Sequence, residues 1–319
     1  MHKPKAPVMI KRLLLFLCLG ISSIGYAQQD PFFSHFALNP LQYNAGWIGA
    51  EQTGYVTLQH RSQWLGYPQG DAPTTQHLTF ALPFVGQKLS GVALNVVNDT
   101  QGPFRRFEAK IGLGYNKEMR TGTLSFGIMP GVISQSIDGD LNPVNPIDPR
   151  IPDSGQSELQ PNMDAGLLFT HKSGYYIGVG FNNLLAPNFS FGAEGQNVIE
   201  RSYAISGAVE YEVGRDIVVI PSAILRTDLN TYTVDLGAIA YLRDKMWGGI
   251  TYRLEESANI LLGYNLLKDN ALKLGYSFEY VLQNQEAKQA TSHELFVRFN
   301  LPNIIIGGKK PVYTPRFIH

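Results

Sequence analysis

Residues 106–116 decide the fold and read Arg-Phe-Glu-Ala-Lys-Ile-Gly-Leu-Gly-Tyr-Asn. From Phe107 to Tyr115, apolar residues alternate strictly with polar residues and glycines. A period of two places these two sets on opposite faces of a β-strand. The stretch therefore predicts a strand with one apolar face and one face that is polar or bare.

The same alternation returns along the chain, between turn signals rich in Gly, Asn and Asp. No stretch has the period of a long amphipathic helix. We therefore predict an all-β protein of about fourteen strands. Their expected residues are 53–61, 73–82, 89–98, 105–118, 121–135, 161–172, 174–183, 200–213, 216–227, 231–242, 245–254, 257–267, 270–283 and 291–301.

Composition narrows the class of protein. Basic and acidic residues both number 26 in 319, so the formal net charge is zero. Without a basic excess, a nucleic-acid partner is not expected. Charged residues make up 16% of the chain, against about 25% in ordinary soluble domains. A mean hydropathy of −0.09 is too polar for a helical membrane protein.

The N-terminus has the pattern of a targeting segment. Four basic residues precede an apolar run at 13–19, and Gly25-Tyr26-Ala27 offers small residues at a cleavage site. This predicts a cleaved signal peptide at residues 1–27. A membrane anchor is the alternative, but the run is shorter than the roughly 20 residues that a helical span needs. The only cysteine, Cys18, lies in this segment, so no disulfide is expected in the mature chain.

Three features favour a transmembrane antiparallel up-and-down β-barrel in the outer membrane. They are the export signal, the short turns between strands, and the polar face that each strand has opposite its apolar face. Backbone groups in a bilayer must pair within the sheet, so a membrane sheet has to close on itself. A soluble or periplasmic β-protein is the alternative. We expect a signal peptide at 1–27, an N-terminal plug segment at 28–52, the barrel at 53–301 and a C-terminal tail at 302–319.

Two long loops, 136–161 and 184–199, interrupt the strands. Long barrel loops usually face the outside, so we expect the loops around Asp148 and after Leu184 to grip a protein partner. Aromatic and Arg side chains commonly anchor such contacts. The second loop offers Phe189 and Phe191, with Arg201 just beyond it.

No catalytic or metal-binding motif is complete. Asp138-x-Asp140-x-Asn142 begins like a calcium loop, but Pro143 stands where the turn needs Gly. His293-Glu294 lacks the second His of a zinc protease helix, and Glu294 is expected to be an inward acid near Arg298. We predict no cofactor and no enzyme. A barrel enzyme acting on lipid or glycan, with a carboxylate pair in the lumen, is the alternative.

A series of short motifs runs through the mature chain in a fixed order. They are Gln29-Asp30-Pro31-Phe32-Phe33-Ser34-His35-Phe36, Asn39-Pro40-Leu41, Asn44-Ala45-Gly46-Trp47-Ile48-Gly49, Arg61-Ser62-Gln63-Trp64, Leu141-Asn142-Pro143 with Asp148-Pro149, Pro221-Ser222, Trp247-Gly248-Gly249 with Tyr252-Arg253, and Ser292-His293-Glu294. Together they resemble the PorP/SprF family of type IX secretion membrane proteins. One departure is Ala45-Gly46, where the family has Pro-Ala, which frees φ at one residue.

The resemblance implies an outer-membrane barrel of a Gram-negative cell that serves type IX secretion. It also implies partners: outer-membrane lipid, other secretion components, and a large exported surface protein with a type IX sorting domain. Docking, exporting or anchoring such an adhesin, as in gliding motility, needs no catalysis. A porin or FadL-like barrel for small or apolar solutes is the alternative.

The resemblance also marks residues for partner docking or for the plug. They are Gln29, Asp30, Pro31, Phe33, Ser34, Asn39, Pro40, Asn44, Gly49, Arg61, Gln63, Trp64, Asp148, Trp247, Tyr252, Arg253, His293 and Glu294. The plainer interpretation makes the tryptophans girdle or packing residues, and makes Arg61, Arg253 and Glu294 members of ion pairs in the lumen.

Overall fold

A computed structural model of the chain describes residues 31–67, 72–84, 89–137, 155–190, 198–283 and 288–302. The predicted signal peptide, Gln29, Asp30, the loop with Asp148 and nearly all of the predicted tail lie outside these residues.

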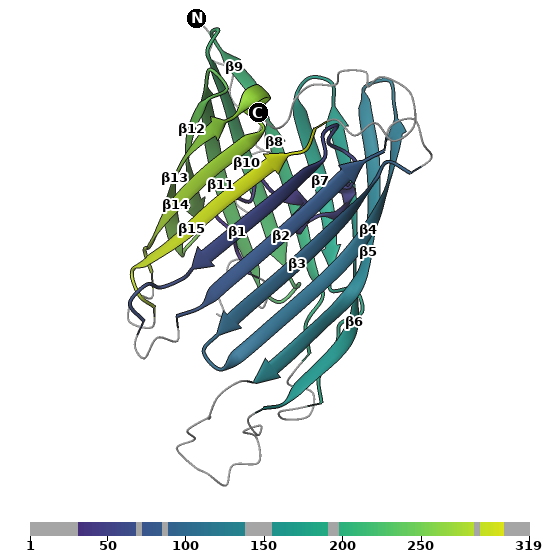
Figure 1. The fold of residues 1–319 in the computed structure, drawn as a ribbon, viewed down its shortest axis with the longest axis vertical. Helices are drawn as coiled ribbons and strands as arrows, with labels where there is room; N and C mark the ends of the chain where they lie inside the picture. Colours follow the sequence, from purple (N-terminus) through teal and green to yellow (C-terminus); the bar gives the residue numbers. More distant parts are fainter. Residues whose placement is uncertain are drawn as a thin grey trace, which may run out of the picture.

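The chain forms a closed antiparallel β-barrel of up-and-down order, in which neighbouring positions around the barrel follow one another along the sequence (Figure 1). The last strand, β15, pairs with the first, β1, so no sheet edge is left open. The predicted all-β up-and-down barrel is therefore confirmed. Its strands are β1 Tyr55–Ser62, β2 Thr74–Pro83, β3 Gly91–Gln101, β4 Phe104–Glu118, β5 Gly122–Ile137, β6 Ser157–His171, β7 Tyr175–Asn182, β8 Ser202–Val209, β9 Tyr211–Val213, β10 Ile217–Thr227, β11 Tyr232–Leu242, β12 Met246–Arg253, β13 Ser257–Leu266, β14 Leu272–Val281 and β15 Thr291–Asn300.

In the described residues, fifteen strand segments occupy fourteen positions around the barrel, because β8 and β9 are two parts of one strand. Both pair with β10, through Ala208 with Ser222 and through Tyr211 with Val219. The break between them falls at Glu210, whose amide bonds to the carbonyl of Gly174 at 2.7 Å. The prediction of about fourteen strands is confirmed.

The two rims of the barrel differ in their connections. One rim, here called the inner rim, holds the start of β1, the end of β15 and short turns such as residues 172–174. The opposite rim, here called the outer rim, holds the long connections 138–156 and 183–201. In outer-membrane barrels the short turns are periplasmic and the long loops extracellular, so the inner rim faces the periplasm.

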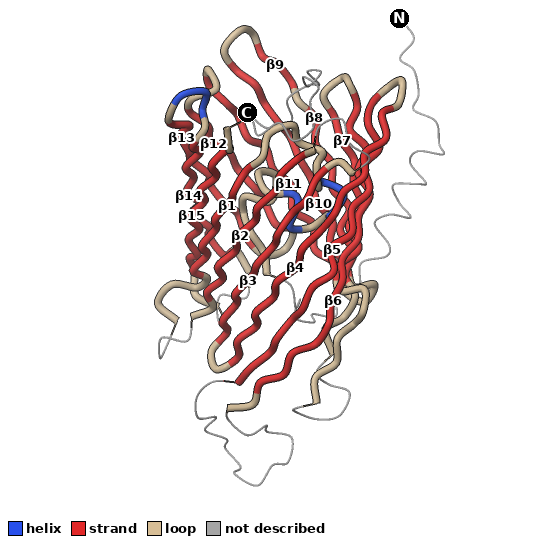
Figure 2. Tube along the Cα trace, turned by 45° about the vertical axis from the view of Figure 1, so that its right-hand side comes forward, coloured by secondary structure: helices blue, strands red, loops and turns tan. Residues whose placement is uncertain are grey.

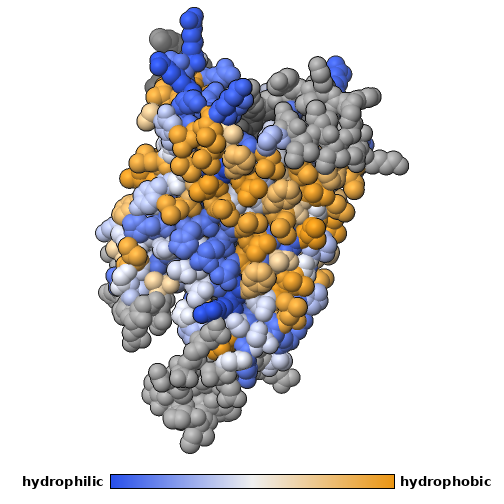
Figure 3. All heavy atoms as spheres, viewed as in Figure 1, coloured by the Kyte–Doolittle hydropathy of each residue, from blue (hydrophilic) through white to orange (hydrophobic). Residues whose placement is uncertain are grey.

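The two faces of each strand differ as the alternation predicts. On β4, Ile111 is 63% exposed on the outside, whereas Lys110 on the lumen side is 3% exposed. Outward apolar side chains cover much of the barrel surface (Figure 3). Such a surface fits a bilayer, and the polar groups turn to the lumen.

One predicted boundary is wrong. The sequence placed a loop over 136–161, but β6 begins at Ser157 and pairs with β5 through Ser157 with Ser136 and Gln160 with Ile133. Residues 157–160 (Ser-Glu-Leu-Gln) are mostly polar. The start of β6 extends past the apolar belt, so its residues do not alternate between apolar and polar and the sequence pattern did not identify them as a strand.

Candidate functional site

Residues 31–54, here called the N-terminal segment, lie inside the barrel. Its two short 3-10 helices, η1 Pro40–Gln42 and η2 Ala45–Trp47, are surrounded by strands (Figure 2). The middle of the segment, residues 33–48, is almost inaccessible to solvent: Phe33 and Leu41 are each 1% exposed, and His35 is fully buried. The lumen is therefore filled rather than open along this stretch.

The segment runs from the outer half of the lumen to the inner rim. Phe32 lies between Arg226 and Arg253, whose guanidinium carbons are 4.4 and 4.3 Å from its ring centre. Both arginines lie at the outer ends of their strands. At the other end, Gly54 leads directly into β1 at the inner rim.

One wall of the lumen, β3 to β7, carries a row of glycines. Gly91 pairs with Gly114, Gly114 with Gly127, Gly127 with Gly166, and Gly166 with Gly180. These five residues, here called the glycine row, cross five neighbouring strands on the lumen face. They form a strip without side chains, which lets another backbone approach the sheet closely.

The N-terminal segment lies along this strip. A Cβ added at Gly127 would overlap the carbonyl of Ala45, and one at Gly180 would overlap the carbonyl of Tyr43. At Gly91, an added Cβ would lie 2.9 Å from the Cα of Gly49. No side chain larger than hydrogen fits in the row without displacing the segment.

Hydrogen bonds fix the segment on this wall. The Asn44 side chain caps η2 by accepting from the Gly46 amide at 2.8 Å, and its Nδ2 donates to the carbonyl of Leu167 at 2.9 Å. Asn116 donates to the carbonyl of Gly49 at 2.6 Å. Because the Gly46 amide and the Gly49 carbonyl of the segment both have hydrogen-bond partners, burying them costs little.

The opposite wall, formed by β11–β15 and β1, is charged and holds the start of the segment through side chains. Glu294 accepts from the Ser34 amide at 2.7 Å, and its other oxygen lies 2.6 Å from Nδ1 of His35. The Ser34 hydroxyl donates to Asn259 at 2.9 Å. Glu294 is 1% exposed, so these contacts form out of water, where they are strong.

The same carboxylate belongs to a buried ionic network. Arg61 lies 3.7 Å from Glu294 and also bonds to Glu279. Arg253 pairs with Asp235 at 2.8 Å and with Glu279 at 3.6 Å. Each buried charge has an opposite charge beside it, which offsets part of its desolvation cost.

Two further contacts hold the middle and the end of the segment. Asn39 donates to Gln59 at 2.8 Å and to Thr79 at 3.0 Å. Glu51, near the end, pairs with Arg298, whose guanidinium stacks 3.8 Å from the ring centre of Tyr55. Glu294 faces the lumen as expected, but its charged partners are His35 and Arg61 rather than Arg298. Arg298 pairs with Glu51 and also donates to the carbonyl of Leu38 at 3.4 Å.

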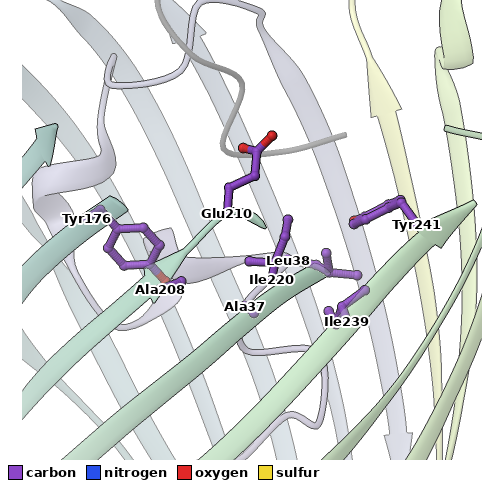
Figure 4. Close-up of a pocket in the computed structure, with 8 residues that line it drawn as sticks. All are labelled: Ala37, Leu38, Tyr176, Ala208, Glu210, Ile220, Ile239 and Tyr241. Atoms are coloured by element: carbon purple, nitrogen blue, oxygen red, sulfur yellow. The ribbon is translucent and has the colours of Figure 1, made fainter. Parts of the chain in front are cut away.

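A small apolar pocket lies between the segment and the wall toward the inner rim (Figure 4). The lining residues are Ala37, Leu38, Tyr176, Ala208, Glu210, Ile220, Ile239 and Tyr241. The polar groups among the lining side chains are the carboxylate of Glu210, at the break between β8 and β9, and the hydroxyls of Tyr176 and Tyr241. Burial raises the pKa of the Tyr43 phenol in the segment nearby, so this group stays neutral and accepts from the Phe33 amide at 3.1 Å.

The structure gathers many of the predicted site residues in the lumen. Some belong to the N-terminal segment: Pro31, Phe33, Ser34, Asn39, Pro40, Asn44 and Gly49. The others are lumen residues of the barrel strands: Arg61, Trp247, Arg253 and Glu294. Trp247 meets His35 edge-on at 5.8 Å between ring centres.

Other predicted residues lie elsewhere. Tyr252 is 40% exposed on the outside of β12. His293 also faces outward, where its Nδ1 lies 2.6 Å from the hydroxyl of Tyr276. Gln63 and Trp64 follow β1 at the outer rim, and Lys288 lies 5.7 Å from the Trp64 ring.

Sequence reasoning missed the glycine row and the partners His35, Glu51 and Asn259. Glycines at alternate positions were visible in the sequence, but their alignment across strands was not. One expected anchor is also wrong: Phe189 is 4% exposed, because its ring packs against Ile133, Ile137 and Ile199. Phe191 lies outside the described residues.

Among the described residues, no group of three or more His, Cys, Asp or Glu side chains is placed to hold a metal ion. In the same residues, no helix is long and apolar enough to span a membrane.

A closed barrel with an apolar exterior and a filled lumen defines an outer-membrane β-barrel protein. The model of the PorP/SprF family, type IX secretion system membrane proteins, matches residues 25–299. The chain belongs to this family, and it is an outer-membrane protein of type IX secretion. Family and fold are those of a secretion or transport barrel.

Solved structures of other proteins are similar to this chain at low sequence identity. The TodX monoaromatic hydrocarbon channel, as a ΔS2S3 mutant, is 9% identical with a TM-score of 0.50, covering 81% of this chain and 92% of that one. A Pseudomonas aeruginosa FadL homologue is 12% identical with a TM-score of 0.48, covering 86% and 95%. Acinetobacter baumannii Omp33 is 7% identical with a TM-score of 0.47, covering 79% and 100%. No curated protein matches the chain.

Proposed function

We propose that this barrel docks an exported cell-surface protein of the type IX pathway through protein contacts at its rims. In this proposal the N-terminal segment keeps the lumen closed to solutes. The observation that carries it is the seating of residues 31–54 inside the barrel, between the glycine row and the ionic network.

A filled lumen favours docking over solute transport. The segment presses its backbone on one wall and inserts Phe32, Ser34 and His35 among buried charges on the other. A permeating solute would have to displace all of these contacts together. The porin or FadL-like alternative needs a continuous path through the same space.

The partner classes follow from the family and from the rims. Family membership supports contact with other type IX secretion components. The outer rim, with its long connections, would meet a large exported protein such as an adhesin, and the anchoring role in gliding motility is one form of this contact. The inner rim would meet periplasmic components. The chemistry needed is binding alone, so we propose no catalysis and no cofactor.

The experiment combines affinity purification with conductance. The tagged barrel, extracted from the outer membrane in detergent, should recover a large exported protein or secretion components that mass spectrometry identifies. In planar bilayers the intact protein should conduct almost no ions. A variant lacking residues 31–52 should conduct strongly, because the polar lumen then fills with water.

Both readouts bear on the alternative. Recovery of the barrel alone, with clear conductance of the intact protein, would contradict docking and favour a solute pore. Heat-dependent gel mobility of the shortened variant provides the folding control, since only a closed barrel changes its mobility on boiling.

A further inference from the structure

The lipid-facing surface is interrupted by polar side chains on three neighbouring strands. His60 and Ser62 on β1, Gln76 on β2 and Asn98 on β3, here called the polar strip, all point outward. They form a chain of hydrogen bonds: Asn98 donates to Gln76 at 2.6 Å, Gln76 lies 3.4 Å from Nδ1 of His60, and Nε2 of His60 lies 3.2 Å from Ser62.

The strip lies within the apolar belt, as strand register indicates. One row of paired residues runs from Tyr276 on β14 through Leu295, His60, Gln76 and Asn98 to Phe107 on β4. Because strands tilt in a barrel, depth changes steadily along such a row. At the two ends of the row, Tyr276 and Phe107 are outward aromatic residues that are 39% and 44% exposed. The depth of the polar residues in the membrane therefore lies between the depths of these two aromatic residues.

Figure 3 shows the same feature as a hydrophilic patch beside the apolar surface, over the region of β15, β1 and β2. The strip is also hollowed. A groove of about 380 Å³ lies over it, edged by apolar side chains that include Leu58, Leu78 and Leu295.

Acyl chains cannot bond to these groups, so an outward polar strip at this depth is costly unless something polar covers it. A lipid headgroup is a poor fit, because headgroup sites are basic and the strip holds no Lys or Arg. Amides, a hydroxyl and an imidazole are uncharged donors and acceptors, which suit another protein within the membrane.

We propose that the polar strip is the contact between two copies of this chain in the outer membrane. The strip can pair with itself, because it mixes donors and acceptors and has unlike ends. A two-fold axis along the membrane normal would place the Asn98 end of one strip against the Ser62 end of the other, as a self-complementary interface requires. The apolar edges of the groove would then pack on both sides.

The first test uses the absence of other cysteines beyond Cys18 in the predicted signal peptide. Gln76→Cys, oxidised in outer-membrane vesicles, should give a disulfide-linked species of twice the barrel mass. The matched control is Ile205→Cys, an outward residue that is 44% exposed on β8, which should stay monomeric. Failure of Gln76→Cys to cross-link, or its cross-linking to a different protein, overturns the proposal.

The second test removes the polar groups without opening the barrel. The triple variant His60→Leu, Gln76→Leu, Asn98→Leu makes this face apolar and should keep heat-dependent gel mobility. Mass photometry in nanodiscs should show dimerisation weakened by about tenfold or more, since each lost hydrogen bond contributes modestly in a membrane. Unchanged dimerisation of a folded triple variant would also overturn the proposal.

Discussion

The N-terminal segment meets two walls that hold it by opposite means. On β3 to β7 the wall has no side chains along the glycine row, and the segment fits there by the shape of its backbone. On β11 to β15 and β1 the wall is charged, and Glu294 holds the Ser34 amide and the His35 ring.

This difference separates two kinds of sequence constraint. The glycine row restricts which residues the barrel can have at those five positions. It restricts the residues of the segment less, because the backbone of the segment can lie on the row whatever side chains the segment carries. The charged wall restricts both sides, because Ser34 and His35 must match Glu294 and Asn259. Changes on the charged wall should therefore cost more than changes on the bare wall, which is open to measurement.

The largest effect is expected for Glu294→Ala. The change takes an acceptor from Ser34, His35 and Arg61, and leaves the arginine with less compensation in a buried site. Removing one member of a buried ion pair costs about 3–5 kcal/mol. The free energy of unfolding in lipid vesicles, from urea titration, should fall by that amount, and bilayer conductance should rise as the segment loosens.

Two variants separate charge from position. Glu294→Gln keeps an acceptor oxygen for the Ser34 amide and should lose less stability. Glu212→Ala removes an exposed carboxylate at the inner end of β9 and should change neither readout. Equal losses for Glu294→Ala and Glu212→Ala would show that the charged wall does not hold the segment.

An intermediate effect is expected for Gly127→Val in the middle of the glycine row. The new side chain meets the carbonyl of Ala45, so the segment or the strand has to shift. Overpacking of this kind costs about 1–3 kcal/mol. Hydrogen exchange at the Gly46 amide, which is bonded to Asn44, should become faster.

The control is Ala165→Val, beside Gly166 on β6 but on the outward face. It adds a branched side chain to the lipid-facing surface and should leave exchange at Gly46 unchanged. If Gly127→Val behaves in the same way, the bare strip is not a seat for the segment.

The barrel could be predicted from the sequence because alternation is a local signal. The glycine row could be predicted only in part. Gly114 and Gly127 flank one short turn, as Gly166 and Gly180 flank another, so each pair follows from its hairpin. The pairing of Gly127 with Gly166 spans the connection 138–156, and no local pattern fixes register across so long a loop.

The prediction that Glu294 lies near Arg298 fails for a geometric reason. Glu294 and Arg298 share the lumen face of one strand, but four residues along a strand span about 13 Å, too far for an ion pair. The true partners, His35 and Arg61, come from the N-terminal segment and from β1. They approach only because β15 closes the barrel against β1, and local spacing does not encode closure.

The smallest effect is expected where the segment meets the charged wall through a ring instead of a hydrogen bond. Phe32 lies between the guanidinium groups of Arg226 and Arg253. Phe32→Leu keeps an apolar side chain but removes the π face. Because Phe32 is only half-buried, this loss should cost about 1–2 kcal/mol. Both arginines keep Asp235, so the ionic network should survive. Urea titration should therefore show a modest loss with unchanged conductance, and a loss as large as that of Glu294→Ala would mean that the ring, not the carboxylate, holds the start of the segment.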